Sequence, residues 1–173
     1  MPTVRVVRTY LEMQSAAELQ PARVPQDAPR IERMEECPGS FFRYLYAEVG
    51  RAYHWTDRLS WSDEQVRAHL ADSDVSLWLL SSRAAPAGYF ELRRHQDESV
   101  EVAYFGLLPE FVGRGWGGHL LTVAVREAWA LQPARVWLHT CTLDHPAALP
   151  NYVKRGFRPV REEVYTAQLP DSA

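Results

Sequence analysis

The chain has 173 residues, of which 46% are hydrophobic and 24% charged, and its formal net charge is −3. This composition supports a packed core and excludes global disorder, and the length suits a single domain over residues 1–173. A weakly acidic chain with scattered basic residues is a poor general binder of nucleic acid, because affinity for phosphate depends on clustered lysine and arginine.

Hydrophobic periodicity and turn residues divide the chain into strands and helices. Ser62 and Gln65 have the spacing of a capping box, and Gly50 and Gly156 follow helical segments as stops. In chain order, the sequence predicts a strand over residues 3–10, a loop over 16–33, helices over 40–49 and 62–71, strands over 75–82, 88–94 and 99–108, a helix over 117–131, a strand over 135–142, a short helix over 147–155 and a strand over 157–169.

The order of these elements predicts an α+β fold with a mixed, mostly antiparallel central sheet flanked by helices. The three strands between residues 75 and 108 are joined by short polar turns, which favours an antiparallel meander. The helix over 117–131 then joins two strands by a crossover, which must be right-handed and makes those two strands parallel.

The two cysteines and the apolar runs bear on compartment and partners. Cys37 and Cys141 lie far apart and outside any metal-binding spacing. The first ten residues lack the apolar core of a secretion signal, and no apolar run approaches the length of a membrane span. We therefore expect a cytoplasmic protein with two free thiols, no metal site and no membrane partner.

The stretch PEFVGRGWGGHLL, residues 109–121, places four glycines just before an apolar helix. A helix N-terminus presents unpaired N–H groups and the positive end of a macrodipole, and glycine lets that backbone approach an anion closely. The stretch therefore predicts a cradle for phosphate or pyrophosphate, with Arg114 adding a charged contact. A flexible turn without a ligand is the alternative.

Two familiar phosphate-binding patterns fit this stretch poorly. The P-loop pattern GxxxxGK[ST] is absent from the sequence. Gly113, Gly115 and Gly118 match the dinucleotide pattern GxGxxG, but the first glycine lies too far from the preceding strand, and no acidic residue ends the next strand. Too few residues follow for the second half of a doubly wound sheet. A dinucleotide-binding protein stays as an alternative, and it predicts binding of NAD.

Together with its flanks, the glycine stretch resembles motif A of the GNAT acetyltransferase superfamily. That motif is a strand with a bulge, followed by [RQ]-x-x-G-x-[GA] at the start of a helix. Here it runs from Val112 to Gly117, and Val112 stands where the family usually has Arg or Gln. Backbone groups do much of the binding in this motif, so the substitution is compatible with it.

A second resemblance lies about thirty-five residues downstream, in HPAALPNYVKRGF. The family ends its core with N-x-x-A-x-x-x-Y-x-x-x-G-F, which matches here except that His145 replaces Asn. Pro150 inside the short helix predicts a late start or a kink, because proline lacks a backbone donor. The resemblance covers residues 75 to 168, and the matched positions are Ala148, Tyr152, Gly156 and Phe157.

The resemblance implies a GNAT-like acyl-CoA N-acyltransferase fold and an enzyme that moves an acetyl group from acetyl-CoA to a primary amine. Transfer would be direct, within a ternary complex. Residues 75–168 would form the cofactor-binding core, and residues 15–72 would contribute the acceptor site. A noncatalytic acyl-CoA-binding or regulatory module with the same fold is the alternative. The implied cofactor-binding residues are Phe105, Leu107, Leu108, Gly113, Arg114, Gly115, Trp116, Gly117 and Gly118.

Two residues are the leading candidates for proton transfer. Tyr152 occupies the family's general-acid position, where a phenol protonates the leaving thiolate; packing in the core is its alternative role. Glu101 is the leading candidate for the base that deprotonates the amine. Alternation of side chains along a strand predicts that Glu101 shares a face with Ala103, Phe105 and Leu107.

Four further residues carry weaker predictions. Glu91 and His139 are rival bases, although a lone histidine on a strand is more often a core residue. Gly106 in mid-strand predicts a bulge or the close approach of a ligand. Cys141 is predicted to be buried in its strand, so no covalent acetyl-enzyme is expected.

Aromatic residues gather between residues 41 and 61. Most of them would cover the sheet, but some lie on a loop where polar tips could line the mouth of a site. An aromatic, partly acidic mouth suits an amine acceptor with apolar bulk, either a small molecule or a peptide. The final strand and the apolar N-terminal cover could each support a homodimer. The candidate mouth residues are Tyr46, His54, Trp55, Asp57 and Arg58.

Overall fold

The computed structural model describes residues 1–169, which contain strands, α-helices and short 3-10 turns. The strands there are β1 (Thr3–Met13), β2 (Arg30–Arg33), β3 (Val75–Ser82), β4 (Ala85–Arg94), β5 (Ser99–Leu107), β6 (Arg135–Cys141) and β7 (Arg158–Gln168). The α-helices are α1 (Gly39–Gly50), α2 (Asp63–Ala71), α3 (Trp116–Ala130) and α4 (Ala148–Lys154). Short 3-10 turns cover Ala16–Glu18, Arg51–Tyr53 and Pro109–Phe111.

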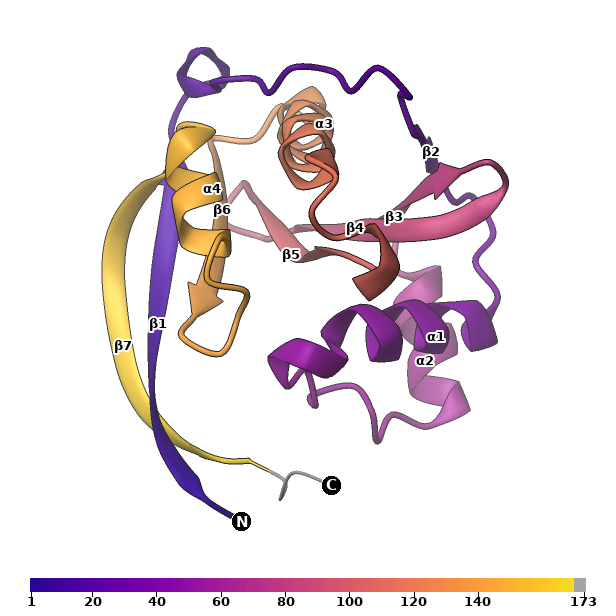
Figure 1. Cartoon of the computed structure of the whole chain (residues 1–173), viewed down its shortest axis with the longest axis vertical. Helices are drawn as coiled ribbons and strands as arrows, with labels where there is room; N and C mark the ends of the chain where they lie inside the picture. Colours follow the sequence, from indigo (N-terminus) through magenta and orange to yellow (C-terminus); the bar gives the residue numbers. More distant parts are fainter. Residues whose placement is uncertain (170–173) are drawn as a thin grey trace.

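The strands form one sheet in the order β2-β3-β4-β5-β6-β1-β7 within the described residues. Neighbouring strands are antiparallel except β5 and β6, which are parallel and are connected through α3. Figure 1 shows α3 on one side of the sheet and α1 and α2 on the other, with β1 and β7 curving away as a long ribbon. The predicted mixed, mostly antiparallel sheet with one crossover is confirmed.

Two hydrophobic clusters hold the helices against the two faces of the sheet. On one face, α3 buries the residues that its helical spacing predicted, and Tyr152 of α4 joins the same cluster. On the other face, α1 and α2 pack over β3 and β4 through Phe42, Leu45, Val49 and Val66. The buried residues of α3 include Leu120, Leu121, Ala124, Val125 and Ala128.

Local signals set the start of two helices. Ser62 Oγ accepts a bond from the N–H of Gln65 at 3.2 Å, and Gln65 Oε1 accepts one from the N–H of Ser62 at 2.8 Å, so the predicted capping box is present. Helix α4 begins at Ala148, one residue later than predicted. Pro150 therefore falls in the first turn, where the missing N–H would have no helical partner in any case.

The prediction of an uninterrupted loop over residues 16–33 is wrong. A 3-10 turn covers Ala16–Glu18, and β2 adds an edge strand paired with β3, from Arg30 opposite Ser81 to Arg33 opposite Trp78. The side chains of β2 are mostly exposed, so they lack the apolar alternation by which a strand is recognised in a sequence. Pairing with β3 makes this segment a strand.

Strand β5 carries a β-bulge at Ala103. The pairing with β4 steps from Glu91 opposite Tyr104 to Leu92 opposite Val102, so Ala103 is the extra residue. A bulge changes the phase of side-chain alternation along a strand and increases its local twist.

The bulge reverses the predicted orientation of Glu101. Val102 before the bulge, and Phe105 and Leu107 after it, pack with the α3 cluster, whereas Tyr104 packs with the α1–α2 cluster. Glu101 alternates with Val102 and therefore faces the α1–α2 side. The prediction that Glu101 shares a face with Phe105 and Leu107 is wrong for this reason.

Two glycines allow close packing on the α1 side. A Cβ on Gly106 would lie 2.5 Å from Cγ1 of Val49, so glycine here admits α1. The bulge expected at Gly106 lies at Ala103 of the same strand, and Gly106 also borders a large cleft. A Cβ on Gly50 would lie 2.5 Å from Cβ of Trp55. Gly50 ends α1 as predicted but keeps a helical φ of −84°, and the left-handed residue that turns the chain is His54, with a φ of 58°.

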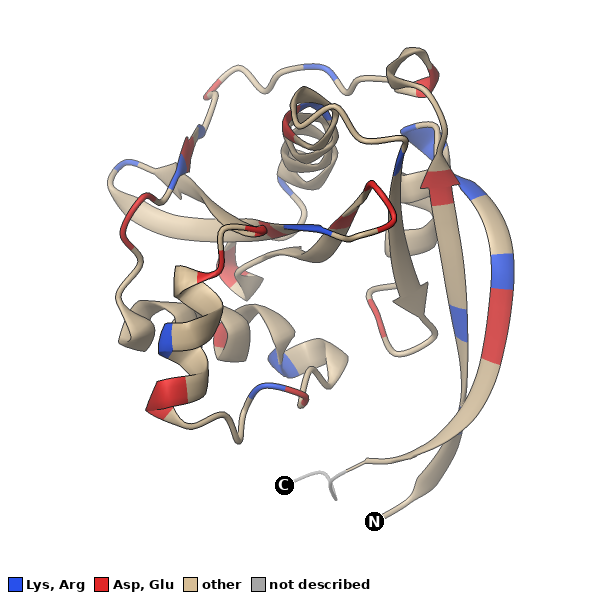
Figure 2. Ribbon diagram, turned by 180° about the vertical axis from the view of Figure 1, so that it is seen from behind, with Lys and Arg blue, Asp and Glu red and all other residues tan. Residues whose placement is uncertain are grey.

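Two general features concern the distribution of charged residues and the lengths of the helices. Figure 2 shows acidic and basic residues interspersed over the strands and helices of the ribbon. Over residues 1–169, no helix is both long and apolar enough to cross a bilayer.

Replacing Gly50 by alanine is expected to lower the free energy of unfolding by about 1–3 kcal/mol, because the new methyl group would overlap Trp55. Gly117→Ala is the matched control: the described residues place no heavy atom within 4 Å of its Cβ. Alanine in a helix should leave stability unchanged or raise it by about 0.5–1 kcal/mol. Urea unfolding of both variants measures this, and a Gly50→Ala variant as stable as wild type would contradict the close packing.

Candidate active site

A cleft opens where β5 and β6 separate. Their parallel pairing runs from Ser99 opposite Arg135 to Glu101 opposite Trp137 and then ends. Beyond Glu101, β5 stays paired with β4 while β6 stays paired with β1, so the two halves of the sheet diverge. The space between them is a cleft of about 930 Å³, at the upper end of the usual range for small-molecule sites.

Segments that lie far apart in the sequence form the walls of the cleft. One wall is β5 from Glu101 to Leu107, and the facing wall is the end of β6 with the start of α4. The connection between α1 and α2, residues 53–58, closes one end, and the glycine turn closes the other. Tyr53 touches His145 across the gap, with ring centroids 6.3 Å apart.

The glycine turn presents bare backbone to the cleft. Gly113 and Gly115 adopt left-handed φ angles of 88° and 77°, which glycine tolerates best. In the described structure nothing lies within 4 Å of a Cβ built on Gly113, Gly115 or Gly117. Because the first N–H groups of α3 have no partner within the helix, this turn is suited to hold a phosphate or pyrophosphate. Gly118 also lines the cleft, beside Ala22.

Three of the predicted cofactor-binding residues do not line the cleft. Trp116 is 1% exposed and stacks on Phe111, with ring centroids 5.5 Å apart. The guanidinium of Arg114 lies over the same two rings, at 4.8 and 5.3 Å. Leu108 is buried, and its N–H donates to the carbonyl of Ala87. Trp116 and Leu108 therefore support the turn from behind.

The other predicted residues of β5 do reach the cleft. Phe105 and Leu107 both line it. Beyond Glu101, the edge of β5 that faces β6 has no strand partner. Alternate residues of that stretch direct their N–H and C=O groups into the gap, where a ligand can bind as an added strand.

Tyr152 both packs in the core and lines the cleft. Its ring contacts Phe105 and Phe157 edge-on, with centroids 6.2 and 6.3 Å apart, and the residue is 8% exposed. Burial, with the nearby charge of Asp144, raises the pKa of the phenol above its ordinary value. The hydroxyl therefore stays protonated at neutral pH and is available as a proton donor. The two roles considered for this residue are compatible.

Glu101 lies at the throat of the cleft, on the last rung of the β5–β6 pairing. Its side chain is 13% exposed, and its Oε2 is 2.8 Å from Nε2 of His95. The structure thus brings Glu101 and Tyr152 to the same cleft, from β5 and from α4.

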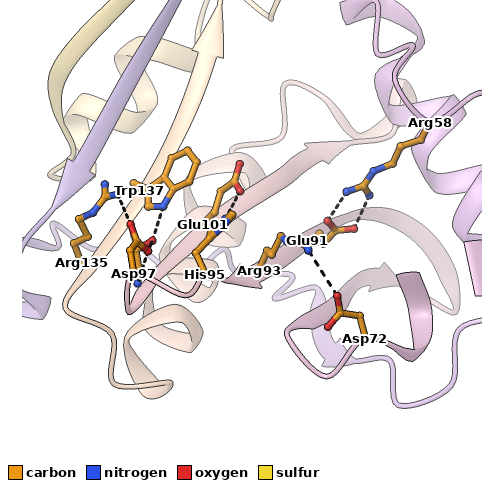
Figure 3. A network of polar contacts seen from close by, with 10 residues as sticks. Arg58, Asp72, Glu91, Arg93, His95, Asp97, Glu101, Arg135 and Trp137 are labelled. Carbon is orange, nitrogen blue, oxygen red and sulfur yellow. Dashed lines mark hydrogen bonds and ion pairs between the residues drawn. The ribbon is translucent and has the colours of Figure 1, made fainter. Parts of the chain in front are cut away.

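Glu91 is excluded as a base, because both of its carboxylate oxygens are engaged. It is fully buried, Arg58 holds it with two hydrogen bonds of 2.7 Å, and His69 Nε2 lies 2.9 Å from Oε1. Figure 3 shows the paired arrangement of Arg58 and Glu91 on the α2 side of the sheet. Burial alone would raise the pKa of the Glu91 carboxyl, but the bonds from Arg58 and His69 hold it below its ordinary value.

His139 and Cys141 both lie in the cleft wall, contrary to their predicted burial. His139 is exposed, and its ring lies 5.5 Å from that of Tyr10. Desolvation by the surrounding cleft walls lowers the pKa of His139, and the positive charge of Arg8 adds to this effect. The imidazole is therefore neutral at neutral pH. Cys141 is half-buried, and burial raises the pKa of its thiol, which makes it a poor nucleophile.

Arg58 anchors the connection between α1 and α2 against the sheet. Its side chain is 9% exposed, and the guanidinium lies 4.1 Å from the ring centroid of Tyr104 and 4.8 Å from that of Trp61. Its backbone N–H donates to the hydroxyl of Tyr46 at 3.3 Å. The five predicted mouth residues all line the cleft, namely Tyr46, His54, Trp55, Asp57 and Arg58.

The end of the cleft beside the α1–α2 connection has an aromatic wall. The ring of Tyr104 lies 4.9 Å from that of Trp55 and 5.2 Å from that of Tyr46. Burial raises the pKa of both tyrosines, so both hydroxyls are neutral. The rings present apolar surface beside the carboxylates of Asp57 and Glu101, which also line the cleft.

Several residues of the cleft have no local signal in the sequence. Arg8 lies opposite Cys141 of β6, and Tyr165 reaches the cleft from β7. Both depend on the pairing of β1 with strands more than a hundred residues away in the chain. Arg93 lines the cleft because it pairs with Glu101 across β4 and β5. Asn151 also lines it, and its position next to Tyr152 in the second motif could have indicated this.

Comparison with known proteins agrees with this geometry. A family model described as "Acetyltransferase (GNAT) family" matches residues 35–157. A GCN5-related N-acetyltransferase from Kribbella flavida has a similar fold, with a TM-score of 0.66 and 17% identity over 95% of this chain and 58% of that one. An acetyltransferase from Bacillus subtilis in complex with CoA has a TM-score of 0.56 and 20% identity over 75% of this chain and 76% of that one.

These comparisons cover most of this chain but a smaller share of several longer proteins that it matches. A solved protein from Staphylococcus epidermidis, of TM-score 0.61 and 17% identity, is matched over 95% of this chain, which spans 61% of that protein's length. The chain therefore spans about three-fifths of the length of some solved proteins that it matches. No curated protein matches it.

Replacing Glu91 by glutamine is expected to lower the free energy of unfolding by about 3–5 kcal/mol, because it leaves the guanidinium of Arg58 buried without a counter-charge. Glu32→Gln is the control: it removes an exposed pair with Arg30, of 3.0 Å, and should cost less than about 1 kcal/mol. Urea unfolding at neutral pH measures both changes.

The same pair predicts how stability depends on pH. The folded pKa of Glu91 lies below its ordinary value of 4.5, so its contribution is present above pH 4.5 and is lost as the pH falls through the folded pKa. Wild type should therefore lose stability on acidification below pH 4.5 more steeply than Glu91→Gln. Parallel slopes would contradict the assigned ion pair.

Proposed function

The chain belongs to the acetyltransferase (GNAT) family, and on that basis we propose that it moves an acetyl group from acetyl-CoA to a primary amine by direct transfer in a ternary complex. One observation carries the proposal. A single cleft is lined by a glycine turn at a helix N-terminus, a neutral phenol and a carboxylate. They come from Gly113, Gly115, Gly117 and Gly118, from Tyr152 and from Glu101. These are the groups that transfer of an acyl group to an amine requires.

The residues of the cleft fit acetyl-CoA as the donor. When bound, it supplies an acetyl thioester, an activated acyl group with a thiolate leaving group. The open positions beside Gly113, Gly115 and Gly117 leave room for a pyrophosphate against the first N–H groups of α3. The unpaired edge of β5, next to Phe105 and Leu107, can bind the pantetheine arm through main-chain hydrogen bonds.

Each proton transfer is assigned to one side chain of the cleft. Glu101, on the acceptor side of β5, takes a proton from the amine nitrogen. Tyr152, kept neutral by burial, donates the proton that the leaving sulfur needs. An N–H of the unpaired part of β5 stabilises the negative charge that develops on the carbonyl oxygen. The protonated thiol of Cys141 supports direct transfer over an acetylated enzyme.

Residues 15–72 form the acceptor side in this proposal, and residues 75–168 form the cofactor-binding core. Trp55, Tyr46 and Tyr104 give the acceptor end an aromatic wall, and Asp57 and Glu101 give it negative charge. An ammonium group beside such rings and carboxylates is stabilised, so the site favours an amine that carries apolar bulk.

A noncatalytic acyl-CoA-binding module is the second candidate. The departures from the family motifs at Val112 and His145 favour it. A ligand present at about 100 times its Kd adds about 2.7 kcal/mol of stability, so thermal unfolding with acetyl-CoA and with NADH tests the cofactor. Release of CoA thiol is then measured with a panel of aliphatic, aromatic and peptide amines. Binding of acetyl-CoA without thiol release would support the second candidate, and stabilisation by NADH alone would contradict both.

Replacing Gly117 by alanine is expected to weaken acetyl-CoA binding about tenfold, equivalent to about 1.4 kcal/mol, because the methyl group would occupy the pyrophosphate cradle. Isothermal titration measures the Kd. Gly39→Ala is the control: its Cβ would make an ordinary 3.4 Å contact with Val66, away from the cleft. An unchanged Kd in Gly117→Ala would show that the cofactor does not use this turn.

Replacing Tyr152 by phenylalanine is expected to lower kcat about 100-fold, because it removes the proton donor for the leaving thiolate. The ring contacts with Phe105 and Phe157 would remain, so the Kd for acetyl-CoA should stay within about twofold of wild type. Tyr44→Phe, on the exposed side of α1, is the matched control. An unchanged kcat would leave Tyr152 with a packing role alone.

A further inference from the structure

Glu101 is held from behind by a histidine that does not line the cleft. His95 follows the last residue of β4, and its Nε2 lies 2.8 Å from Oε2 of Glu101. Figure 3 shows this contact, with His95 beside Glu101 near the β4–β5 turn. With Oε2 engaged by His95, Oε1 remains for the amine.

The imidazole of His95 is itself fixed in place. Its backbone N–H donates to the carbonyl of Ser99 at 2.9 Å, which closes the turn between β4 and β5. Its ring packs against the indole of Trp137, with centroids 5.4 Å apart. The indole Nε1 donates to Ser99 Oγ at 3.0 Å, so Trp137 is held as well.

A carboxylate completes this support at the turn. Asp97 accepts bonds from the N–H and hydroxyl of Ser99, and it pairs with Arg135 at 3.1 Å. The bonds from Ser99, assisted by Arg135, lower the pKa of Asp97 to about 2, so it remains an acceptor at every working pH. In Figure 3, Arg135 contacts Asp97, and this pair lies beside Trp137.

We propose that His95 is a positioning residue: its imidazole orients the carboxylate of Glu101 so that Oε1 faces the amine and accepts its proton. The proposal rests on the proposed function, in which Glu101 is the base. In the step itself, the N–H bond of the amine breaks and an O–H bond forms on Oε1 of Glu101. Glu101 then loses this proton to water in the open cleft. His95 exchanges no proton with the substrate.

Other charged groups face Glu101 from the elements around it. From β4, Arg93 lies opposite Glu101 in register and pairs with Asp72 at 3.7 Å. From β6, His139 is electrostatically coupled to Glu101, but its lowered pKa keeps it neutral near pH 7. Arg8 from β1 and Asp57 from the α1–α2 connection act electrostatically on His139, with opposite signs.

The test compares two replacements of His95 in the full chain. Glutamine places an amide nitrogen near the position of Nε2 and donates an uncharged bond at every pH. At neutral pH, kcat of His95→Gln should lie within about threefold of wild type, because the amide keeps a bond to Glu101. His95→Ala should lose about tenfold in kcat, because the base is no longer oriented.

Several readouts separate this role from a merely structural one. The Kd for acetyl-CoA should be unchanged in both variants, since His95 lies away from the glycine turn. His119→Gln replaces a histidine of α3 whose side chain is outside the cleft lining, and it should keep the wild-type kcat. A His95→Ala variant with wild-type kcat, or a His95→Gln variant that loses as much kcat as His95→Ala, would overturn the inference while the acetyltransferase function stands. A wild-type enzyme that releases no CoA thiol with any amine would overturn both.

Discussion

The structure depends above all on the short parallel pairing between β5 and β6. These strands share rungs only as far as Glu101 and Trp137, and each then follows its other neighbour. The bulge at Ala103 lies just beyond this point, where added twist in β5 helps to turn it away from β6. A continuously paired sheet would satisfy more main-chain groups. The divergence leaves those groups on β5 unpaired and creates a cleft that reaches to the centre of the fold, with Glu101 at its throat.

The acceptor wall depends on a second constraint, the buried pair of Arg58 and Glu91. Removing two charges from water is costly, and the pair is stable because two 2.7 Å bonds, His69 and four surrounding rings compensate. Arg58 lies on an irregular connection, whereas Glu91 lies within β4, an interior strand of the sheet, so the bond ties a loop to the sheet. Trp55 and Asp57 flank Arg58 in the chain and are held at the cleft with it. The same tie removes Glu91 from the candidate bases, whereas the proposed base, Glu101, lines the cleft.

The sequence predicted the parts of the site that are local, and missed those that depend on pairing between distant strands. The glycine turn, the capping box at Ser62 and the position of Tyr152 each depend on a few consecutive residues, and all three lie where expected. The predicted orientation of Glu101 was wrong because the bulge expected on this strand lies at Ala103, a position that is set by register with β4. Arg8 and Tyr165 were missed because they reach the cleft through the pairing of β1 with β6 and β7. Likewise, Gly106 is explained by Val49 of α1, a contact that becomes visible only in three dimensions.

The proposed acid and base lie on opposite sides of the gap between β5 and β6. Their surroundings, and therefore the protonation of each, are set by different parts of the fold. Tyr152 lies on α4 against Phe105 and Phe157, inside the α3 cluster, where burial keeps its proton in place. Glu101 lies on the opposite face, where His95 and the turn network of Ser99 and Asp97 hold it near solvent. A donor that must stay protonated benefits from burial, while a base that must be regenerated each turnover benefits from access to water. The divergence of β5 and β6 allows both environments to border one cleft, so the chemistry proposed for this chain follows from the same break in pairing that forms the site.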